Sequence, residues 1–192
     1  FQQDARIEIR ELLVELALDR IPQNQPGNVL DLGTGSGIIA ISIAKNRPFV
    51  TVSAVDQSQA ALAVARENAA RLQVPNLRLL QSNWFSSLED EVFELIVSNP
   101  PYVEAADPHL LQGDVRFEPL SALASGADGL DDIRRIAAAA LQHLKPGGWL
   151  LFEHGYNQGE RCREILRQQG LSAVETIRDL AGLERVSLGV KE

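Results

Sequence analysis

The chain has 192 residues, 45% of them hydrophobic and 23% charged, and a formal net charge of −8 at pH 7. This length and composition suit one globular domain over residues 1–192. An acidic balance has the wrong sign for a domain that must grip a phosphate backbone unaided, so we expect no direct nucleic-acid partner. No apolar run reaches the roughly 20 residues that span a bilayer, and no secretion signal opens the chain, so we expect a cytoplasmic protein with no membrane partner.

Short β-rich runs alternate with helical patterns along the chain, which indicates an α/β sheet. A lead-in of residues 1–27 carries an amphipathic helix over residues 6–20. Further helices are expected at residues 38–46, 59–72 and 130–144. Strands are expected at residues 29–32, 51–55, 77–80, 95–98 and 149–153, with a terminal pair at 173–177 and 185–190. We expect Pro146-Gly147-Gly148 to be the turn before the fifth strand. Parallel strands joined by helices bind ligands at their carboxyl ends.

The first strand runs into a loop with glycine at every second position from Gly33 to Gly37, followed by a helix. Such a loop lets a ligand approach the backbone beside a helix N-terminus. The dinucleotide pattern G-x-G-x-x-G is not met, and Asp31 would repel a pyrophosphate. An acid there suits the cationic amino-acid group of S-adenosylmethionine, which we expect as the cofactor. The expected cofactor-binding residues of this segment are Asp31, Gly33, Thr34, Gly35, Ser36 and Gly37.

The second and third strands each end in a candidate binding residue. Asp56 ends the second strand, at the separation from the glycine loop where such folds place a carboxylate for ribose hydroxyls. The alternative is an N-cap for the next helix, but Ser58 supplies a cap as well, so we favour ribose binding. After the third strand, Trp84 is a candidate to stack on adenine and Asn83 to bond its edge. Core packing is the other interpretation of Trp84.

Asn99-Pro100-Pro101-Tyr102 follows the fourth strand and is the most informative motif of the chain. Two prolines remove two backbone donors and fix φ, which leaves the carbonyls of Asn99 and Pro100 as rigid acceptors beside an amide side chain and an aromatic ring. A planar amino group, from an amide or a nucleobase, has two donors for these acceptors and a flat face for Tyr102. The alternative is a plain turn that ends a strand.

Asp31, the glycine loop, Asp56, Trp84 and Asn99 follow one another in an order that resembles class I S-adenosylmethionine-dependent methyltransferases. Five further segments narrow this resemblance to the HemK/PrmC family of protein-(glutamine-N5) methyltransferases. They are Gly113 to Leu120, Leu123 to Gly126, Asp128-Gly129-Leu130, Glu153-His154-Gly155 and Glu184-Arg185. The resemblance implies a Rossmann-like, mostly parallel seven-stranded sheet with helices on both faces and an antiparallel C-terminal strand.

The resemblance also implies an enzyme that methylates the glutamine of a Gly-Gly-Gln motif in a peptide chain release factor and releases S-adenosylhomocysteine. It places catalysis on Asn99, Pro100 and Tyr102, and substrate binding on these three together with Pro101. It places cofactor binding on Gly33 to Gly37, Asp56, Trp84 and Asn99. Two features depart from the family. Asn83 stands where the family has aspartate, and residues 6–11 keep little of its motif before the first strand. The family's helical N-terminal domain is absent from this chain, which begins with Phe1 and contains no methionine, so we expect a longer product.

Two other functions remain open. A methyltransferase for adenine-N6 or guanine-N2 is the nearest alternative, because the same motif serves those amino groups; the acidic charge and the lack of a Lys/Arg-rich tract oppose it. A catalytically silent cofactor-binding module is the second, opposed by the intact Asn99 motif. We expect structural roles for Glu118, His154 and Cys162 and no metal site. No heptad pattern suggests assembly, so we expect a monomer.

Overall fold

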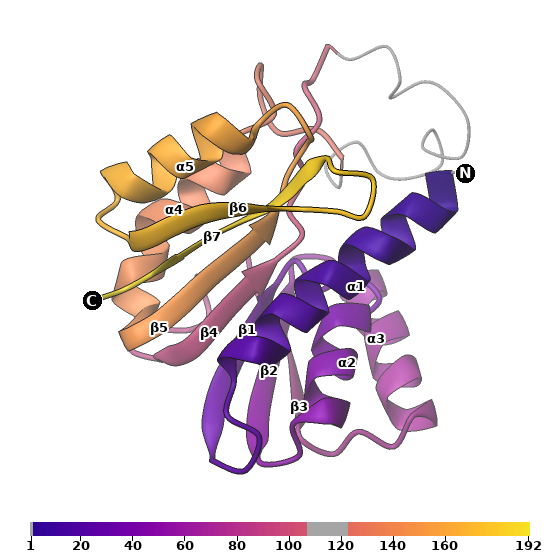
Figure 1. Ribbon diagram of the computed structural model, residues 1–192. Helices are drawn as coiled ribbons and strands as arrows, with labels where there is room; N and C mark the ends of the chain where they lie inside the picture. The colour runs from indigo at the N-terminus through magenta and orange to yellow at the C-terminus, as the bar shows by residue number, and fades with distance from the viewer. Residues whose placement is uncertain (1, 107–122) are drawn as a thin grey trace.

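The computed structural model describes residues 2–106 and 123–192, with side chains from Ile9 onward (Figure 1). The segment Gly113 to Leu120, with Glu118, therefore lies outside the described residues. The strands are β1 (Gly27–Leu32), β2 (Val50–Asp56), β3 (Leu77–Gln81), β4 (Phe93–Ser98), β5 (Leu144–Glu153), β6 (Ser172–Arg178) and β7 (Glu184–Val190). The helices are α1 (Gln2–Arg20), α2 (Ile38–Asn46), α3 (Gln59–Arg71), α4 (Asp131–His143) and α5 (Gly159–Gln168).

All seven described strands form one sheet in the order β3-β2-β1-β4-β5-β7-β6. Strands β1 to β5 pair in parallel, and β7 runs antiparallel between β5 and β6. Parallel strands need crossover connections. Helices supply them after β1, β2 and β4, whereas β3 and β4 are joined by residues 82–92 without a helix. The prediction of a mostly parallel seven-stranded sheet with an antiparallel C-terminal strand is confirmed.

Helices cover both faces of the sheet, with α1, α2 and α3 on one side and α4 and α5 on the other (Figure 1). Successive side chains of a strand point to opposite faces. Val29 of β1 accordingly packs into the core under α1 and α2, while Leu30 packs into the core under α4 and α5. Both are fully buried, which explains why the central strands carry apolar residues at consecutive positions and do not alternate strictly.

The start of β5 differs from the sequence prediction. The strand begins at Leu144, directly after α4, and the expected Pro146-Gly147-Gly148 turn is a bulge inside it. Leu144 pairs with Phe93, but the next paired residue is Trp149, opposite Leu95. Gly147 has a φ of 77° and donates its N–H to the carbonyl of Lys191 at 2.7 Å. Pairing on both sides of the bulge, which a local pattern does not reveal, makes this segment part of the sheet.

None of the helices among the described residues combines the length and apolar character that crossing a membrane requires.

Candidate active site

A cavity of about 490 Å³ opens at the edge where the parallel strands β1 to β5 reach their carboxyl ends. Segments that follow all five strands contribute to its wall, as the topology of a parallel sheet requires. Its lining residues are Arg10, Gly33, Gly35, Asp56, Gln57, Ser82, Asn83, Trp84, Asn99, Pro100, Pro101, Tyr102, Val103, Leu123, Ala124, Asp132, Arg135 and Glu153.

The glycine loop after β1 forms one wall through its backbone. Gly33 and Gly35 have φ values of 69° and 58°, in the left-handed region that glycine adopts without strain. A Cβ atom on Gly35 would meet no atom within 4 Å, so this stretch of backbone is open to a ligand. A Cβ atom on Gly33 would lie 3.4 Å from the ring of Trp84. The loop and the indole ring are therefore neighbours in the cavity wall, with room for about one methyl group between them.

Asp31 lies behind the glycine loop and does not line the cavity. Its Oδ2 accepts hydrogen bonds from the Thr34 hydroxyl at 2.6 Å and from the Ala40 N–H at 3.2 Å. Its Oδ1 is buried and has no hydrogen-bond donor among the described residues. Burial raises the pKa of Asp31 to about 6. Thr34, Ser36 and Gly37 are likewise absent from the cavity lining, so only Gly33 and Gly35 of the six cofactor residues predicted in this segment line the cavity.

Asp56 lies at the cavity wall and fixes the loop from the side of β2. Its Oδ2 accepts the N–H of Gly35 at 2.9 Å, and its Oδ1 accepts the N–H of Ser58 at 2.8 Å. The N-cap of α3 is Ser58, whose hydroxyl accepts the N–H of Ala61 at 3.2 Å. The alternative role of Asp56 as that cap is therefore wrong, and its carboxylate keeps lone pairs for a ligand.

Trp84 and Asn83 form the wall that follows β3. Trp84 has a φ of 52°, an uncommon value for a residue with a large side chain. Its ring lines the cavity and also packs against the core under α4 and α5. Core packing is therefore confirmed, and stacking on adenine stays a prediction. Asn83 is exposed and also lines the cavity.

Asn99 to Tyr102 follow the end of β4 and form a further part of the cavity wall. Across the described residues, no hydrogen bond is made to the side-chain amide of Asn99 or to the carbonyls of Asn99 and Pro100. These acceptors therefore face the cavity with their lone pairs available. Tyr102 is anchored instead. Its hydroxyl donates to Oε1 of Glu153 at 2.8 Å, and its carbonyl accepts from Nε2 of Gln158 at 3.0 Å.

Several lining residues are not predicted from the sequence. Glu153 ends β5 and is only 2% exposed, yet the sequence indicated it only as part of a family motif. Gln57 and Ser82 directly follow β2 and β3, which is the one signal that could have found them. The charged residues Arg10, Asp132 and Arg135 come from helices, and only the tertiary fold brings them to the cavity.

Two residues with reactive side chains lie away from the cavity. His154 is fully buried, with Nδ1 2.8 Å from the carbonyl of Gly155 and Nε2 2.9 Å from the Ser187 hydroxyl. Burial lowers the pKa of His154. Cys162 is buried on the inner side of α5, and burial raises the pKa of its thiol to about 12. In the part of the chain that the structure describes, no cluster of His, Cys, Asp and Glu is arranged to hold a metal ion.

Residues 12–113, more than half of the chain, match the family model of the methyltransferase small domain. The chain belongs to this family. The solved structures it resembles share the class I methyltransferase fold, among them the 16S rRNA N2 G1207 methyltransferase of T. thermophilus in complex with AdoMet and guanosine. That structure has a TM-score of 0.67 and 22% identity, covering 95% of this chain and 43% of the other.

Curated relatives of this methyltransferase small domain carry a more specific name. The chain is 54% identical to the release factor glutamine methyltransferase of Pseudomonas aeruginosa and 49% identical to that of Escherichia coli. Each match covers 93% of this chain. The chain spans 64% of the length of either relative. A release factor-specific protein-(glutamine-N5) methyltransferase from Alicyclobacillus acidocaldarius superposes with a TM-score of 0.59 at 28% identity, covering 96% of this chain and 93% of the other. The resemblance stated from the sequence motifs is confirmed.

Proposed function

We propose that this protein transfers a methyl group from S-adenosylmethionine to the side-chain amide nitrogen of a glutamine, in the Gly-Gly-Gln motif of a peptide chain release factor. The observation that carries this proposal is the pair of available acceptors on Asn99 and Pro100, two residues that line the same cavity as Gly33 and Gly35 of the glycine loop. The names of the relatives at about half identity support the same substrate. The reaction modulates translation termination.

The cavity fits the cofactor by the chemistry of its donors and acceptors. The backbone at Gly33 and Gly35 is open to close approach, and the Asp56 carboxylate suits ribose hydroxyls. Trp84 and Asn83 suit the face and the edge of adenine. The buried oxygen of Asp31 that lacks a donor places negative charge behind the loop. This charge would attract a cationic amino-acid group bound on the cavity side of the loop. When bound, S-adenosylmethionine supplies an electrophilic methyl group.

The chain's own task is to make an amide nitrogen available and to aim it. This nitrogen is a poor nucleophile because its lone pair is delocalised, as the rotation barrier of roughly 18–20 kcal/mol shows. We assign Oδ1 of Asn99 and the carbonyl of Pro100 as acceptors for the two amide hydrogens. They orient the lone pair toward the side of the cavity that the glycine loop forms, while Tyr102 packs on the amide plane.

Positioning of two bound reactants supplies roughly 7–11 kcal/mol of the barrier. Fixed dipoles on Asn99 and Pro100 add to this as positive charge develops on nitrogen. No dedicated general base is required, because the methylated nitrogen becomes strongly acidic and loses a proton to water or to a nearby acceptor. His154 is too far inside the core to take that proton, since its two ring nitrogens are engaged with Ser187 and Gly155.

We further infer that the protein acts as a monomer in the cytoplasm, where release factors work, without direct contact with nucleic acid. The net charge of −8 supports the last point. A methylated nucleobase remains the main alternative product, since the acceptors on Asn99 and Pro100 suit any planar amino group.

The experiment is a methyl-transfer assay with labelled S-adenosylmethionine that offers a purified bacterial release factor, total RNA and DNA side by side. The label is then located by peptide mapping and nucleoside analysis. We expect label on the glutamine of Gly-Gly-Gln, and none on a release factor whose glutamine is replaced by asparagine. Label on adenine or guanine would replace the proposal by a nucleic-acid methyltransferase, and no label with retained cofactor binding would favour a silent binding module.

A further inference from the structure

Gln158, in the turn between β5 and α5, uses its whole side-chain amide on three backbone groups. Its Nε2 donates to the carbonyl of Tyr102 at 3.0 Å and to the carbonyl of Asp128 at 3.2 Å. Its Oε1 accepts the N–H of Gly155 at 2.8 Å. The residue is 6% exposed, so these bonds replace water and are not in competition with it. One side chain thus joins the Tyr102 end of the Asn99 motif to two separate loops.

The fit around this amide leaves no spare volume. Gly129 has a φ of 72°, and a Cβ atom on it would lie 2.2 Å from the carbonyl oxygen of Tyr102 and 2.7 Å from Nε2 of Gln158. Both distances are far below van der Waals contact, so only glycine is accommodated there. The loop before α4 is therefore pressed against the Tyr102 carbonyl at the point where Gln158 binds it.

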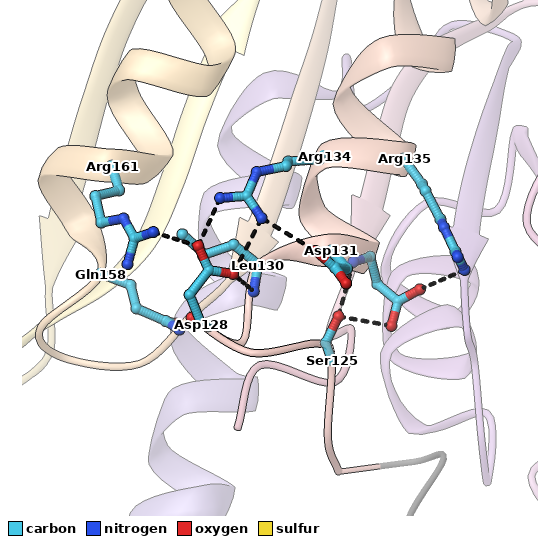
Figure 2. A network of polar contacts seen from close by, with 9 residues as sticks. Ser125, Asp128, Leu130, Asp131, Arg134, Arg135, Gln158 and Arg161 are labelled. Atoms are coloured by element: carbon cyan, nitrogen blue, oxygen red, sulfur yellow. Dashed lines mark hydrogen bonds and ion pairs between the residues drawn. The ribbon is translucent and has the colours of Figure 1, made fainter. Parts of the chain in front are cut away.

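Charged side chains from two helices hold this loop (Figure 2). Both oxygens of Asp128 contact the guanidinium of Arg134 on α4, at 3.0 Å and 2.6 Å, and Oδ2 also pairs with Arg161 on α5. Its Oδ1 accepts the N–H of Leu130 at 3.2 Å. A two-pronged arginine contact fixes the orientation of a carboxylate. The Asp128 carbonyl that receives Gln158 is thereby held in place from both helices.

We propose that Gln158 is a positioning residue for methyl transfer, which holds the Tyr102 carbonyl and so sets where the acceptors of Asn99 and Pro100 point. Pro100 and Pro101 have fixed φ angles, so the four-residue motif moves as a stiff unit. Anchoring Tyr102 at its carbonyl and at its hydroxyl therefore also orients Asn99. This role rests on the proposed function, and Gln158 itself lies outside the cavity lining.

The test compares Gln158→Glu and Gln158→Met with the same changes at Gln168, an exposed residue at the other end of α5. Glutamate keeps the size but turns both donors into acceptors that face two carbonyls, whereas methionine removes the hydrogen bonds without adding charge. We expect kcat for release factor methylation to fall about 10- to 100-fold, more for glutamate than for methionine, since small misplacements of reacting groups cost that much. The KM for release factor and the Kd for S-adenosylmethionine stay unchanged, and both Gln168 variants match the parent.

Rates are counted per cofactor-binding site, and thermal unfolding reports the folded fraction. The positioning role is wrong if folded Gln158 variants keep the parent kcat, or if they lose cofactor affinity in step with kcat. In either case, methylation of release factor by the parent protein would still support the proposed function. If the parent itself does not methylate release factor, both proposals fall. Should the Gln158 variants not fold, Arg161→Gln decides. It removes one partner of Asp128 at the surface, and we expect a smaller loss of kcat with the Kd unchanged; a normal kcat would overturn the proposal.

Discussion

The hydroxyl of Tyr102 donates a 2.8 Å hydrogen bond to Oε1 of Glu153 and so ties the loop after β4 to the carboxyl end of β5. Glu153 is 2% exposed, and a buried carboxylate is tolerated only where donors compensate for lost water. The bond therefore serves two purposes. It supplies a donor to a buried acid, and it holds an aromatic ring against the cavity wall.

Tyr102→Phe keeps the ring and removes this donor. We expect the free energy of unfolding to fall by about 1–3 kcal/mol, because a buried oxygen of Glu153 loses this donor. We also expect a lower kcat for release factor methylation, because the ring is no longer tethered. Urea unfolding and steady-state kinetics measure the two effects. Tyr156→Phe, at an exposed tyrosine, is the control and should change neither quantity.

Asn99→Ala removes the side-chain acceptor that faces the cavity. We expect methyl transfer to be lost while S-adenosylmethionine still binds measurably, because the glycine loop, Asp56 and Trp84 are unchanged. A labelled-methyl assay and calorimetric titration check both halves. Asn24→Ala, in the exposed loop before β1, should retain full activity. Full activity in the Asn99 variant would sink the assigned mechanism.

The parts of the site that the sequence predicts are those encoded by short contiguous patterns. Gly33 and Gly35 follow a strand directly, and Asn99 to Tyr102 do the same, so the topology of a parallel sheet places them at one edge without further information. Arg10, Asp132 and Arg135 lie on helices and reach the cavity only through packing. The bulge at Gly147 depends on pairing with Phe93 on one side and Lys191 on the other, which no local pattern encodes.

Asp31 makes stability depend on pH. Its folded-state pKa is about 6, above the ordinary value of 3.8 for an aspartate, because burial disfavours the charged form. Between pH 4 and pH 6 the folded state therefore keeps a proton that the unfolded state has lost, so the free energy of unfolding falls as pH rises through this window. The loss of stability levels off above pH 6, at about 3 kcal/mol.

Asp31→Asn removes this titration. We expect the free energy of unfolding of the variant, relative to that of the parent, to be up to about 3 kcal/mol higher at pH 7 than at pH 4. Urea unfolding across that range measures this difference. We also expect it to bind S-adenosylmethionine more weakly, because the negative charge behind the glycine loop is lost. A stability difference that does not vary with pH would contradict the assigned pKa.

Gly33→Ala separates backbone strain from ligand contact. A residue with a side chain loses about 1–2 kcal/mol in the left-handed region, and this Cβ would also fill the space between the loop and the ring of Trp84. Gly147→Ala is the matched control, since its φ of 77° is similar and its Cβ would meet nothing within 4 Å. We expect both variants to lose stability in thermal unfolding. Only Gly33→Ala should weaken the binding of S-adenosylmethionine, and equal binding by the two would show that the approach of loop and indole is immaterial.

The antiparallel strand β7 sets the order in which the molecule can be completed. It lies between β5 and β6, and it places Val186 opposite Glu153. Until residues 184–190 have left the ribosome, β5 is an exposed edge, and the strand that carries the Tyr102 anchor has no partner on that side. A growing chain therefore cannot complete this edge of the sheet until residues 184–190 are free to pair with β5.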